Sequence, residues 1–157
     1  MPYRSFDQNC SIARTLEVVG ERWTILVLRE VSLGFHRFEE IQRHLGIATN
    51  VLTDRLTTLV ERDVLKKVPT ERPDRFEYRF TRKGASLSPV ITAMMHWGDE
   101  WEAPDGPPRL LIHTACGHET HAVATCAHCG EQLEPNEIRT APGPGADVEQ
   151  VALGMRP

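Results

Sequence analysis

Residues 38–63 carry two amphipathic helical patterns separated by only a short turn, and this arrangement constrains the fold more than any other feature. The first pattern covers 38–45 and is closed by Gly46, a residue that suits a helix C-terminus. The second follows at once, and Thr49 or Asn50 is placed to cap it. Its apolar positions share one helical face: Leu52, Leu56, Leu59 and Val60. The sequence therefore predicts a helix, a turn and a second helix.

Two further helical segments precede this pair. Ile12, Leu16 and Val19 recur at helical spacing, and Gly20 is placed to end that helix. Residues 21–31 are apolar on nearly all sides, a pattern typical of a central buried helix. We therefore expect this second segment to form the middle of the core.

Two short runs rich in β-forming residues follow the helices, at 65–69 and 76–80. The polar stretch TERPDR separates them, so they predict a β-hairpin with a basic tip. Thr81 then offers an N-cap for a long helix that reaches about residue 102. This helix carries an apolar seam that needs a partner surface, formed by Val90, Met94, Trp97 and Trp101. We interpret Trp23, Trp97 and Trp101 as core or dimer-interface residues.

The formal net charge of −4 is unevenly distributed along the chain. Residues 1–103 carry 15 Lys and Arg against 15 Asp and Glu, whereas residues 104–157 carry 3 against 7. Within the first part, residues 66–83 hold seven bases and three acids. A local basic stripe matters more for binding nucleic acid than the total charge does. The charge pattern therefore indicates the hairpin as a DNA-binding element.

Two helices beside a basic hairpin fit duplex DNA, because one helix can enter the major groove while the basic loop contacts the backbone. With its leucines inward, the helix at 49–63 turns polar side chains outward, and Arg55 flanks the buried face. A polar face that only meets solvent is the plain alternative. The predicted DNA-contacting residues are Thr49, Asn50, Thr53, Arg55 and Thr57 on the helix, and Arg72 and Arg75 at the hairpin tip.

Several segments, in this order, resemble the HxlR family of winged-helix regulators, which are relatives of the MarR group. After Cys10 the matching text is RTLEVVGERWTILVLRE, HRFEEIQRHLGI, NVLTDRL and RFEYRFTRKGASLSPV, covering roughly residues 10–101. The resemblance implies a winged helix-turn-helix, mainly α with a small β-hairpin wing. It also implies a homodimer, held together by the N-terminal and the long C-terminal helices, that binds a pseudo-palindromic operator. Some regulators of this type sense oxidants or electrophiles through a cysteine at the position of Cys10.

Cys10 lies just before the first predicted helix, where a helix N-terminus can make a thiol reactive. Arg14, one turn further on, is placed to stabilise a thiolate. A packed or capping cysteine without a signalling role is the alternative. The sequence leaves redox sensing through Cys10 as a hypothesis.

The Pro/Gly segment at 103–108 cannot continue a helix and predicts a domain boundary. We assign residues 1–103 to a DNA-binding and dimerisation domain, and residues 104–108 to a linker. Residues 109–134 would form a small Cys/His module, with strands at 109–112 and 122–125. The remaining residues, 135–157, predict a flexible tail with a short ordered piece around 148–153.

The Cys/His module repeats one local pattern, in which a metal ligand is followed by two residues, a cysteine and a glycine. The pattern occurs at His113-x-x-Cys116-Gly117 and at Cys126-x-x-Cys129-Gly130, and each copy suits the tight turn of a zinc knuckle. Two knuckles supply one tetrahedral site, so His113, Cys116, Cys126 and Cys129 predict a structural zinc ion in a ribbon-like β module. His118, His121 and His128 compete with His113, and His121 is the strongest rival. A cysteine cluster without metal is the alternative.

The N-terminal sequence lacks the apolar stretch of a secretory signal, and no apolar run approaches the roughly 20 residues that a membrane span needs. We therefore expect a cytoplasmic protein without a membrane partner. No Ser/His/Asp set, phosphate-binding loop or HExxH motif indicates an enzyme. The predicted function is sequence-specific transcription regulation on double-stranded DNA. A protein-interaction adaptor on the same scaffold is the alternative.

Overall fold

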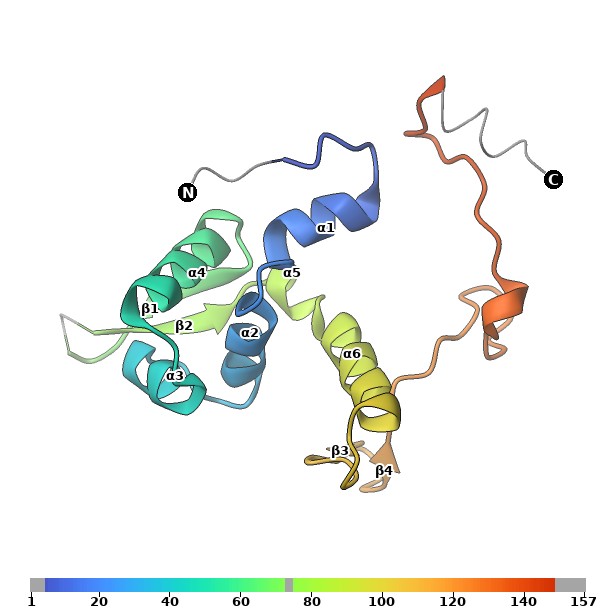
Figure 1. Cartoon of the computed structure of the whole chain (residues 1–157). Helices are drawn as coiled ribbons and strands as arrows, with labels where there is room; N and C mark the ends of the chain where they lie inside the picture. Colours follow the sequence, from blue (N-terminus) through green and yellow to red (C-terminus); the bar gives the residue numbers. More distant parts are fainter. Residues whose placement is uncertain (1–4, 73–74, 149–157) are drawn as a thin grey trace.

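Helix α2 (Thr24–Ser32) lies at the centre of the N-terminal half in the computed structural model, which describes residues 5–72 and 75–148 (Figure 1). Its Val27, Leu28 and Val31 side chains are at most 2% exposed. The prediction of a central buried helix is confirmed, although the helix begins at Thr24 instead of residue 21.

Helices α3 (Phe38–Leu45) and α4 (Thr49–Glu61) pack against α2 and form the predicted helix-turn-helix. The leucine face of α4 is buried as expected. The capping prediction is wrong, because the N-cap of α4 is Ala48 and no side chain caps it. Thr49 is instead the first residue of the helix, and its hydroxyl accepts a hydrogen bond from Gln42 Nε2 at 2.7 Å.

Strands β1 (Leu65–Pro69) and β2 (Phe76–Phe80) form an antiparallel hairpin with the bounds that the sequence predicts. Leu65 faces Phe80 in the register, and Leu65 and Tyr78 join the core under α4 and α2. The Tyr78 N–H donates to the carbonyl oxygen of His36 at 2.8 Å, which ties the hairpin to the loop before α3. The hairpin is therefore the wing of a winged helix-turn-helix.

The long helix expected from Thr81 to residue 102 is divided in two. Thr81 caps a short α5 (Arg82–Ala85), and the chain bends before α6 (Ser88–Trp101). The Leu87 N–H returns to the carbonyl oxygen of Gly84, closing the first segment with a tighter turn. Pro89 is the second residue of α6, a position that suits proline because the N–H groups of the first turn have no partner within the helix.

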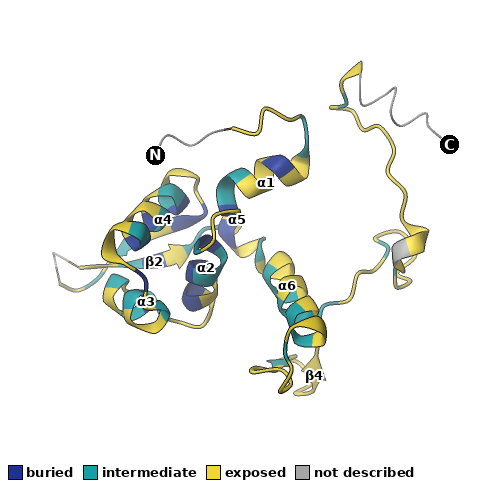
Figure 2. Cartoon of the chain, in the orientation of Figure 1, coloured by how far each residue is buried: buried dark blue, intermediate teal, exposed yellow. Residues whose placement is uncertain are grey.

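Helices α1 (Ser11–Val19) and α6 are exposed along much of their length (Figure 2), and several of their exposed residues are apolar. Ile12 is 71% exposed and Leu16 is 46% exposed, so only part of the predicted stripe on α1 enters the core. Within the described part of the chain, no helix is long and apolar enough to cross a membrane. The four residues of the α6 seam are 42–65% exposed: Val90, Met94, Trp97 and Trp101.

The C-terminal segment contains two short strands, β3 (Leu111–Ile112) and β4 (Glu119–Thr120), and the turn η1 (Pro135–Glu137). The predicted strand at 122–125 is wrong, because β3 pairs with β4 instead. Gly117, at φ 73°, reverses the chain early enough for the return strand to begin at Glu119. Beyond β4 the chain runs in an extended path toward η1 (Figure 1). Of the predicted ordered piece at 148–153, residues 149–153 lie outside the described residues.

Replacing Gly84 with alanine should destabilise the protein. A β-carbon at this buried position would overlap the carbonyl oxygen of Val64 and approach Phe80 Cδ1 to 2.9 Å. Relieving such a clash by shifting the backbone costs about 1–3 kcal/mol, which urea denaturation monitored by circular dichroism can measure.

The matched control is Gly98→Ala in α6, where a β-carbon meets no atom of the described residues within 4 Å. This variant should unfold at the same or a slightly higher urea concentration, because alanine is favoured over glycine inside a helix by about 1 kcal/mol. Equal stability of the two alanine variants would contradict the packing described for Gly84.

Candidate nucleic-acid interface

The outward face of α4 carries short uncharged polar side chains and one carboxylate, that of Asp54. Thr49, Asn50, Thr53 and Thr57 are all exposed, as the sequence predicts for a helix that enters a groove. The Thr53 hydroxyl donates to the carbonyl oxygen of Thr49 at 2.8 Å, so its methyl group and second lone pair remain available. This face offers amide and hydroxyl groups of the kind that hydrogen-bond to base edges.

Arg55 lies on a different side of α4 from these residues. It is half-buried, and its Nη1 atom is 3.7 Å from a carboxylate oxygen of Glu21. The structure thus places Arg55 beside the loop before α2 instead of with the outward polar residues. Its predicted DNA contact stays a prediction and requires the ion pair to open.

Helix α3 holds α4 in position through its two ends. At its start, the Arg37 N–H donates to Glu40 Oε2 at 3.1 Å, which fixes the first turn. At its end, Gly46 adopts a left-handed φ of 62°, which lets the chain turn sharply into α4. Because Ile41 is fully buried against the core, the turn and both helix ends are fixed relative to α2.

The wing presents its predicted arginines at a tip that is closed by backbone hydrogen bonds. The Thr70 N–H donates to the Arg75 carbonyl oxygen at 3.0 Å, and the Arg75 N–H donates to that of Arg72 at 3.0 Å. Both arginine side chains are exposed. These hydrogen bonds hold Arg72 and Arg75 close together at the end of the wing, where their guanidinium groups can meet a phosphate backbone.

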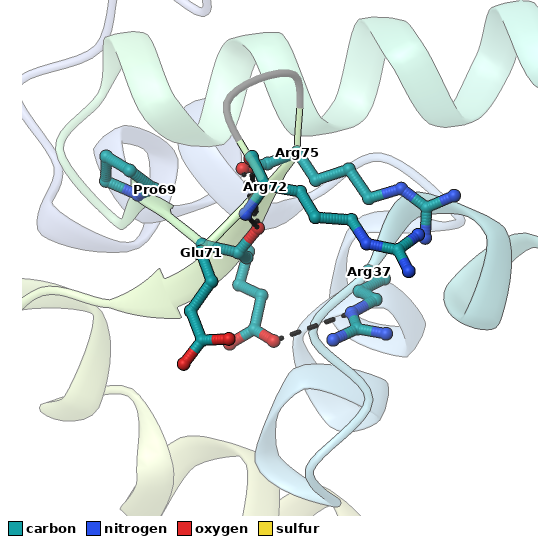
Figure 3. A pocket seen from close by; sticks show the side chains of 7 residues that line it. Arg37, Pro69, Glu71, Arg72 and Arg75 are labelled. Atoms are coloured by element: carbon teal, nitrogen blue, oxygen red, sulfur yellow. Dashed lines mark hydrogen bonds and ion pairs between the residues drawn. The ribbon is translucent and has the colours of Figure 1, made fainter.

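A third arginine, Arg37, joins these two although it lies 35 residues away from Arg72 in the chain. Arg37, Arg72 and Arg75 line one open cavity of about 520 Å³ together with Glu71 and Glu77. Figure 3 shows the side chains of Arg72 and Arg75 running in the same direction, toward the side where Arg37 lies. The loop before α3 and the wing tip thus combine into one basic surface, which we call the Arg37/72/75 cluster.

The carboxylate of Glu77 is largely compensated by neighbouring arginines. Arg79 donates to Glu77 Oε2 from Nη2 at 2.7 Å and from Nε at 3.2 Å, and Arg37 Nε lies 3.5 Å from Glu77 Oε1. The hydrogen bonds from Arg79, helped by the charges of Arg79 and Arg37, hold the pKa of Glu77 below its usual value. Glu77 therefore stays ionised and orients Arg37 without cancelling the whole cluster.

Sequence reasoning missed Arg37. Arg37 directly precedes α3, where the helix dipole favours a negative charge over a positive one. An arginine at this unfavourable position could have indicated a functional role from the sequence alone. The hydrogen bond of Tyr78 to His36, together with the contact of His36 with Arg79, brings this position beside the wing.

The two predicted zinc knuckles adopt the same backbone turn. In the first, the Gly117 N–H donates to the His113 carbonyl oxygen at 2.7 Å, and the His113 N–H donates to that of His118 at 2.9 Å. In the second, the Gly130 N–H donates to the Cys126 carbonyl oxygen at 2.9 Å, and the Cys126 N–H donates to that of Glu131 at 2.8 Å. Each turn ends on a left-handed glycine. The repeated sequence pattern thus folds into a repeated local structure.

Within each knuckle the two predicted ligands lie close together. His113 Nδ1 is 3.2 Å from Cys116 Sγ, and the backbone N–H groups of Cys129 and His128, together with the Cys129 side chain, lower the pKa of the Cys126 thiol through hydrogen bonds. Among the described residues, however, no three His, Cys, Asp or Glu side chains form a group that could hold a metal ion. The structure therefore forms the two pairs but does not bring them to one point.

The rival histidines have other contacts. The ring of His121 stacks on the ring of His96 in α6, with 4.6 Å between the centroids. His118 uses its carbonyl oxygen in the first knuckle, and His128 uses its N–H in the second. The stacking on His96 places the His121 ring beside α6, whereas the His113 ring lies beside Cys116 Sγ; the contacts of His118 and His128 are backbone contacts and do not occupy their rings.

Cys10 is the N-cap of α1 and is partly exposed. Its neighbour Asn9 donates to the Gly145 carbonyl oxygen at 2.8 Å and accepts from Arg14 Nη2 at 2.6 Å. The C-terminal segment 140–146 accordingly lines a cavity beside Cys10. Arg14 is thus hydrogen-bonded to Asn9, and the predicted support of a Cys10 thiolate stays a prediction.

A family model of HxlR-like helix-turn-helix proteins matches residues 18–105. The chain belongs to this family. The matched residues include α2 to α6 and the wing, so the family covers the core, the outward face of α4 and the Arg37/72/75 cluster. Members of the HxlR-like family are DNA-binding transcriptional regulators and not enzymes, as the sequence predicts.

Relatives and solved structures agree with this assignment. An uncharacterised HTH-type transcriptional regulator of Mycobacterium tuberculosis (strain CDC 1551 / Oshkosh) is 44% identical over 137 residues, 86% of this chain and 87% of the relative. A candidate transcription factor of known structure is 35% identical, with a TM-score of 0.79 over 87% of this chain and 97% of that one. The redox regulator HypR in its oxidized form is 26% identical, with a TM-score of 0.53 over 58% of this chain and 96% of its own.

Stability should depend on pH through His36, which faces the wing. Its Nδ1 atom is buried without a hydrogen bond to any described residue, and its Nε2 atom lies 2.7 Å from Arg79 Nη1. Burial, followed by the charge of Arg79, lowers the pKa of His36 below its ordinary value of 6.5. The unfolded chain therefore takes up a proton at a higher pH than the folded chain, and stability falls as the pH drops from about 7.

The measurement is the urea denaturation midpoint of wild type and His36→Gln between pH 7.5 and 5.5. The wild type should lose more stability across this range than the variant, because glutamine does not titrate. An identical pH dependence of the two proteins would show that His36 makes no contribution. All other histidines are common to both proteins, so the difference isolates this one ring.

Proposed function

We propose that the protein is a homodimeric regulator that places α4 in the major groove of an operator and the Arg37/72/75 cluster on the adjacent phosphate backbone. The observation that carries this proposal is the cluster itself. It groups three guanidinium groups on one side of a winged helix-turn-helix whose α4 exposes Asn50 and three threonines, together with the acidic Asp54 and Glu61. Guanidinium groups bind phosphates bidentately, which positions the protein, whereas Asn50 and the threonines suit base edges.

The homodimer is supported by the apolar surface on α1 and α6. Ile12 and Leu16 of α1 and Val90 and Met94 of α6 line a common groove of about 710 Å³. Trp97 and Trp101 extend the exposed apolar seam beyond it. A contiguous apolar surface of this kind marks an interaction site, and a second copy would bury the same residues from both sides. The two α4 helices would then read half-sites roughly 34 Å apart.

Redox sensing through Cys10 stays a prediction. Support comes from HypR, a redox regulator of similar fold. In this chain residues 140–146 line a cavity together with Cys10, so oxidation of the thiol would first change its contacts with these residues.

We also propose a structural zinc ion bound by His113, Cys116, Cys126 and Cys129. The support is the identical hydrogen-bonded turn around both pairs, because this turn aims two side chains at one ion. Three sulfur ligands and one nitrogen ligand are a common set for a structural site. Binding would draw the pairs together through residues 121–125, which connect them. A module this small gains its stability from the metal.

Alanine at Arg75 or Arg37 should weaken binding to all duplexes alike. Each lost phosphate contact lowers the slope of log affinity against log salt concentration by about 0.9. Asn50→Ala should instead cost about 1–3 kcal/mol on the preferred duplex only. Fluorescence anisotropy at several salt concentrations, with the region upstream of the protein's own gene and a scrambled duplex, measures both effects.

Arg139→Ala is the matched control, since Arg139 is exposed in the C-terminal segment, outside α4 and the wing. Its affinity and salt slope should equal those of the wild type. Equal binding of upstream and scrambled duplexes would contradict sequence-specific regulation and favour an adaptor. The native mass of the wild type, measured by light scattering, must be that of a dimer.

Purified protein should contain one zinc ion per chain, measured by atomic emission. Cys126→Ser should lose most of it, because a tetrahedral site with three ligands remaining binds far more weakly. Cys10→Ser, which changes the cysteine outside the module, should retain the metal. Cobalt substitution should give the visible absorption of thiolate ligands in the wild type and in Cys10→Ser. Zinc loss from both variants, or metal-free wild type, would contradict the site.

A further inference from the structure

A second cavity lies on the opposite face of α6 from the apolar seam. It has a volume of about 610 Å³, within the range of pockets that hold small molecules. Its walls come from the end of α2, the end of β2, α5, α6 and residues 109–111. The cavity therefore joins the winged helix to the segment that leads into the first knuckle.

The lining of this cavity is apolar, with positive charge at two points. Aliphatic, thioether and aromatic side chains form most of the wall, and Leu111, Ile91 and Met95 are half-buried there. Arg29 and Arg109 are its only charged lining residues, so none of the described residues that line it is acidic. An apolar interior with guanidinium groups on its wall matches a molecule that has an apolar body and one carboxylate.

We infer that this cavity binds a small amphipathic carboxylate, an aromatic or medium-chain acid, as the effector of the regulator. The apolar body would occupy the space between α2 and α6, and the carboxylate would bind Arg109 and Arg29. Arg109 is exposed, so it can fold over the ligand at no cost to the core.

Arg29 connects the cavity to the helix-turn-helix through a buried carboxylate. Arg29 donates to Glu30 Oε1 from Nη2 at 2.6 Å and from Nε at 3.0 Å. The other oxygen of Glu30, Oε2, lies 3.2 Å from His44 Nδ1 in α3. The Glu30 residue is 3% exposed, so water does not replace these partners.

A ligand carboxylate would compete with Glu30 for Arg29. A buried carboxylate that loses a charged partner is strongly destabilised, so Glu30 would then depend more on His44. The His44 ring also packs against Phe35, with 3.8 Å between the centroids. A change at Glu30 would therefore act on the C-terminal end of α3 through His44, and on the loop before α3 through the contact of His44 with Phe35. Ligand binding and DNA binding become thermodynamically coupled, and the coupling is reciprocal.

The test uses 4-phenylbutyrate as the probe and the neutral 4-phenylbutanamide as its matched control, both by isothermal titration calorimetry on the full chain. The acid should bind at least about tenfold more tightly than the amide, the factor expected for one charge-assisted hydrogen bond. Arg109→Gln should remove that preference, whereas Arg139→Gln should keep it. Met95→Trp should abolish binding of both probes by filling the cavity. Equal affinities for acid and amide, or binding unchanged in Met95→Trp, would overturn the inference.

The link to α3 is tested without DNA, through the NMR signals of the His44 ring. Saturating 4-phenylbutyrate should shift these signals in the wild type but not in Glu30→Gln, which still forms the cavity. Arg109→Gln is the second variant if Glu30→Gln fails to fold, because it lacks one proposed carboxylate contact, and its His44 signals should not shift at the probe concentration that saturates the wild type. A bound probe that leaves His44 unmoved would overturn the coupling.

The effect on DNA affinity rests on the proposed function. The acid should weaken binding to the upstream duplex by wild type and not by Met95→Trp. Failure of the proposed function would appear as absent sequence preference without any probe, whereas failure of the effector inference would appear as unchanged affinity with it.

Discussion

Val27, Leu28 and Val31 of α2 are excluded from water, and α3, α4 and the wing all close over them. Each of these elements is short and would be marginal alone, since an isolated helix of nine residues or a single hairpin does not persist in water. Burial against one central helix supplies the missing stability. It also fixes the angle between α4 and the wing, so the two DNA-facing elements act as a unit. The exposed polar residues of α4 and the wing are then not needed for stability and are available for binding DNA.

The basic surface follows from the same constraint. The wing hairpin pairs with the loop before α3 through Tyr78 and His36, and this contact brings Arg37 to the tip arginines. Glu77 lies between them and is held ionised by Arg79. The overall negative charge of the protein is therefore compatible with DNA binding, because residues 1–103 are neutral overall, the net charge of −4 lies in residues 104–157, and the fold brings Arg37, Arg72 and Arg75 together.

The two faces of α6 serve two different proposals, the homodimer and the effector cavity. One face carries the exposed seam that the dimer proposal uses, and the opposite face closes the cavity that holds Arg29 and Arg109. Helix α6 contributes no fully buried residue, so its position depends on what covers these faces. A second copy, a bound acid and a metal-closed C-terminal module would each restrain the same helix. If all three proposals hold, this common dependence would give the regulator several inputs to one DNA-binding unit.

The sequence by itself determined the elements that depend only on residues close together in the chain. Periodicity set α3, α4 and both wing strands almost to the residue, and the ligand spacing set both knuckle turns. Tertiary structure decided the rest. Packing of Gly84 against Val64 accompanies the split of the predicted long helix, and Gly117 turns the chain into β4 before residue 122. Arg37 joined the wing, and Arg55 paired with Glu21, through contacts between distant residues. Hydrophobic periodicity reports which face of an element is buried, but not which distant side chain will lie beside it.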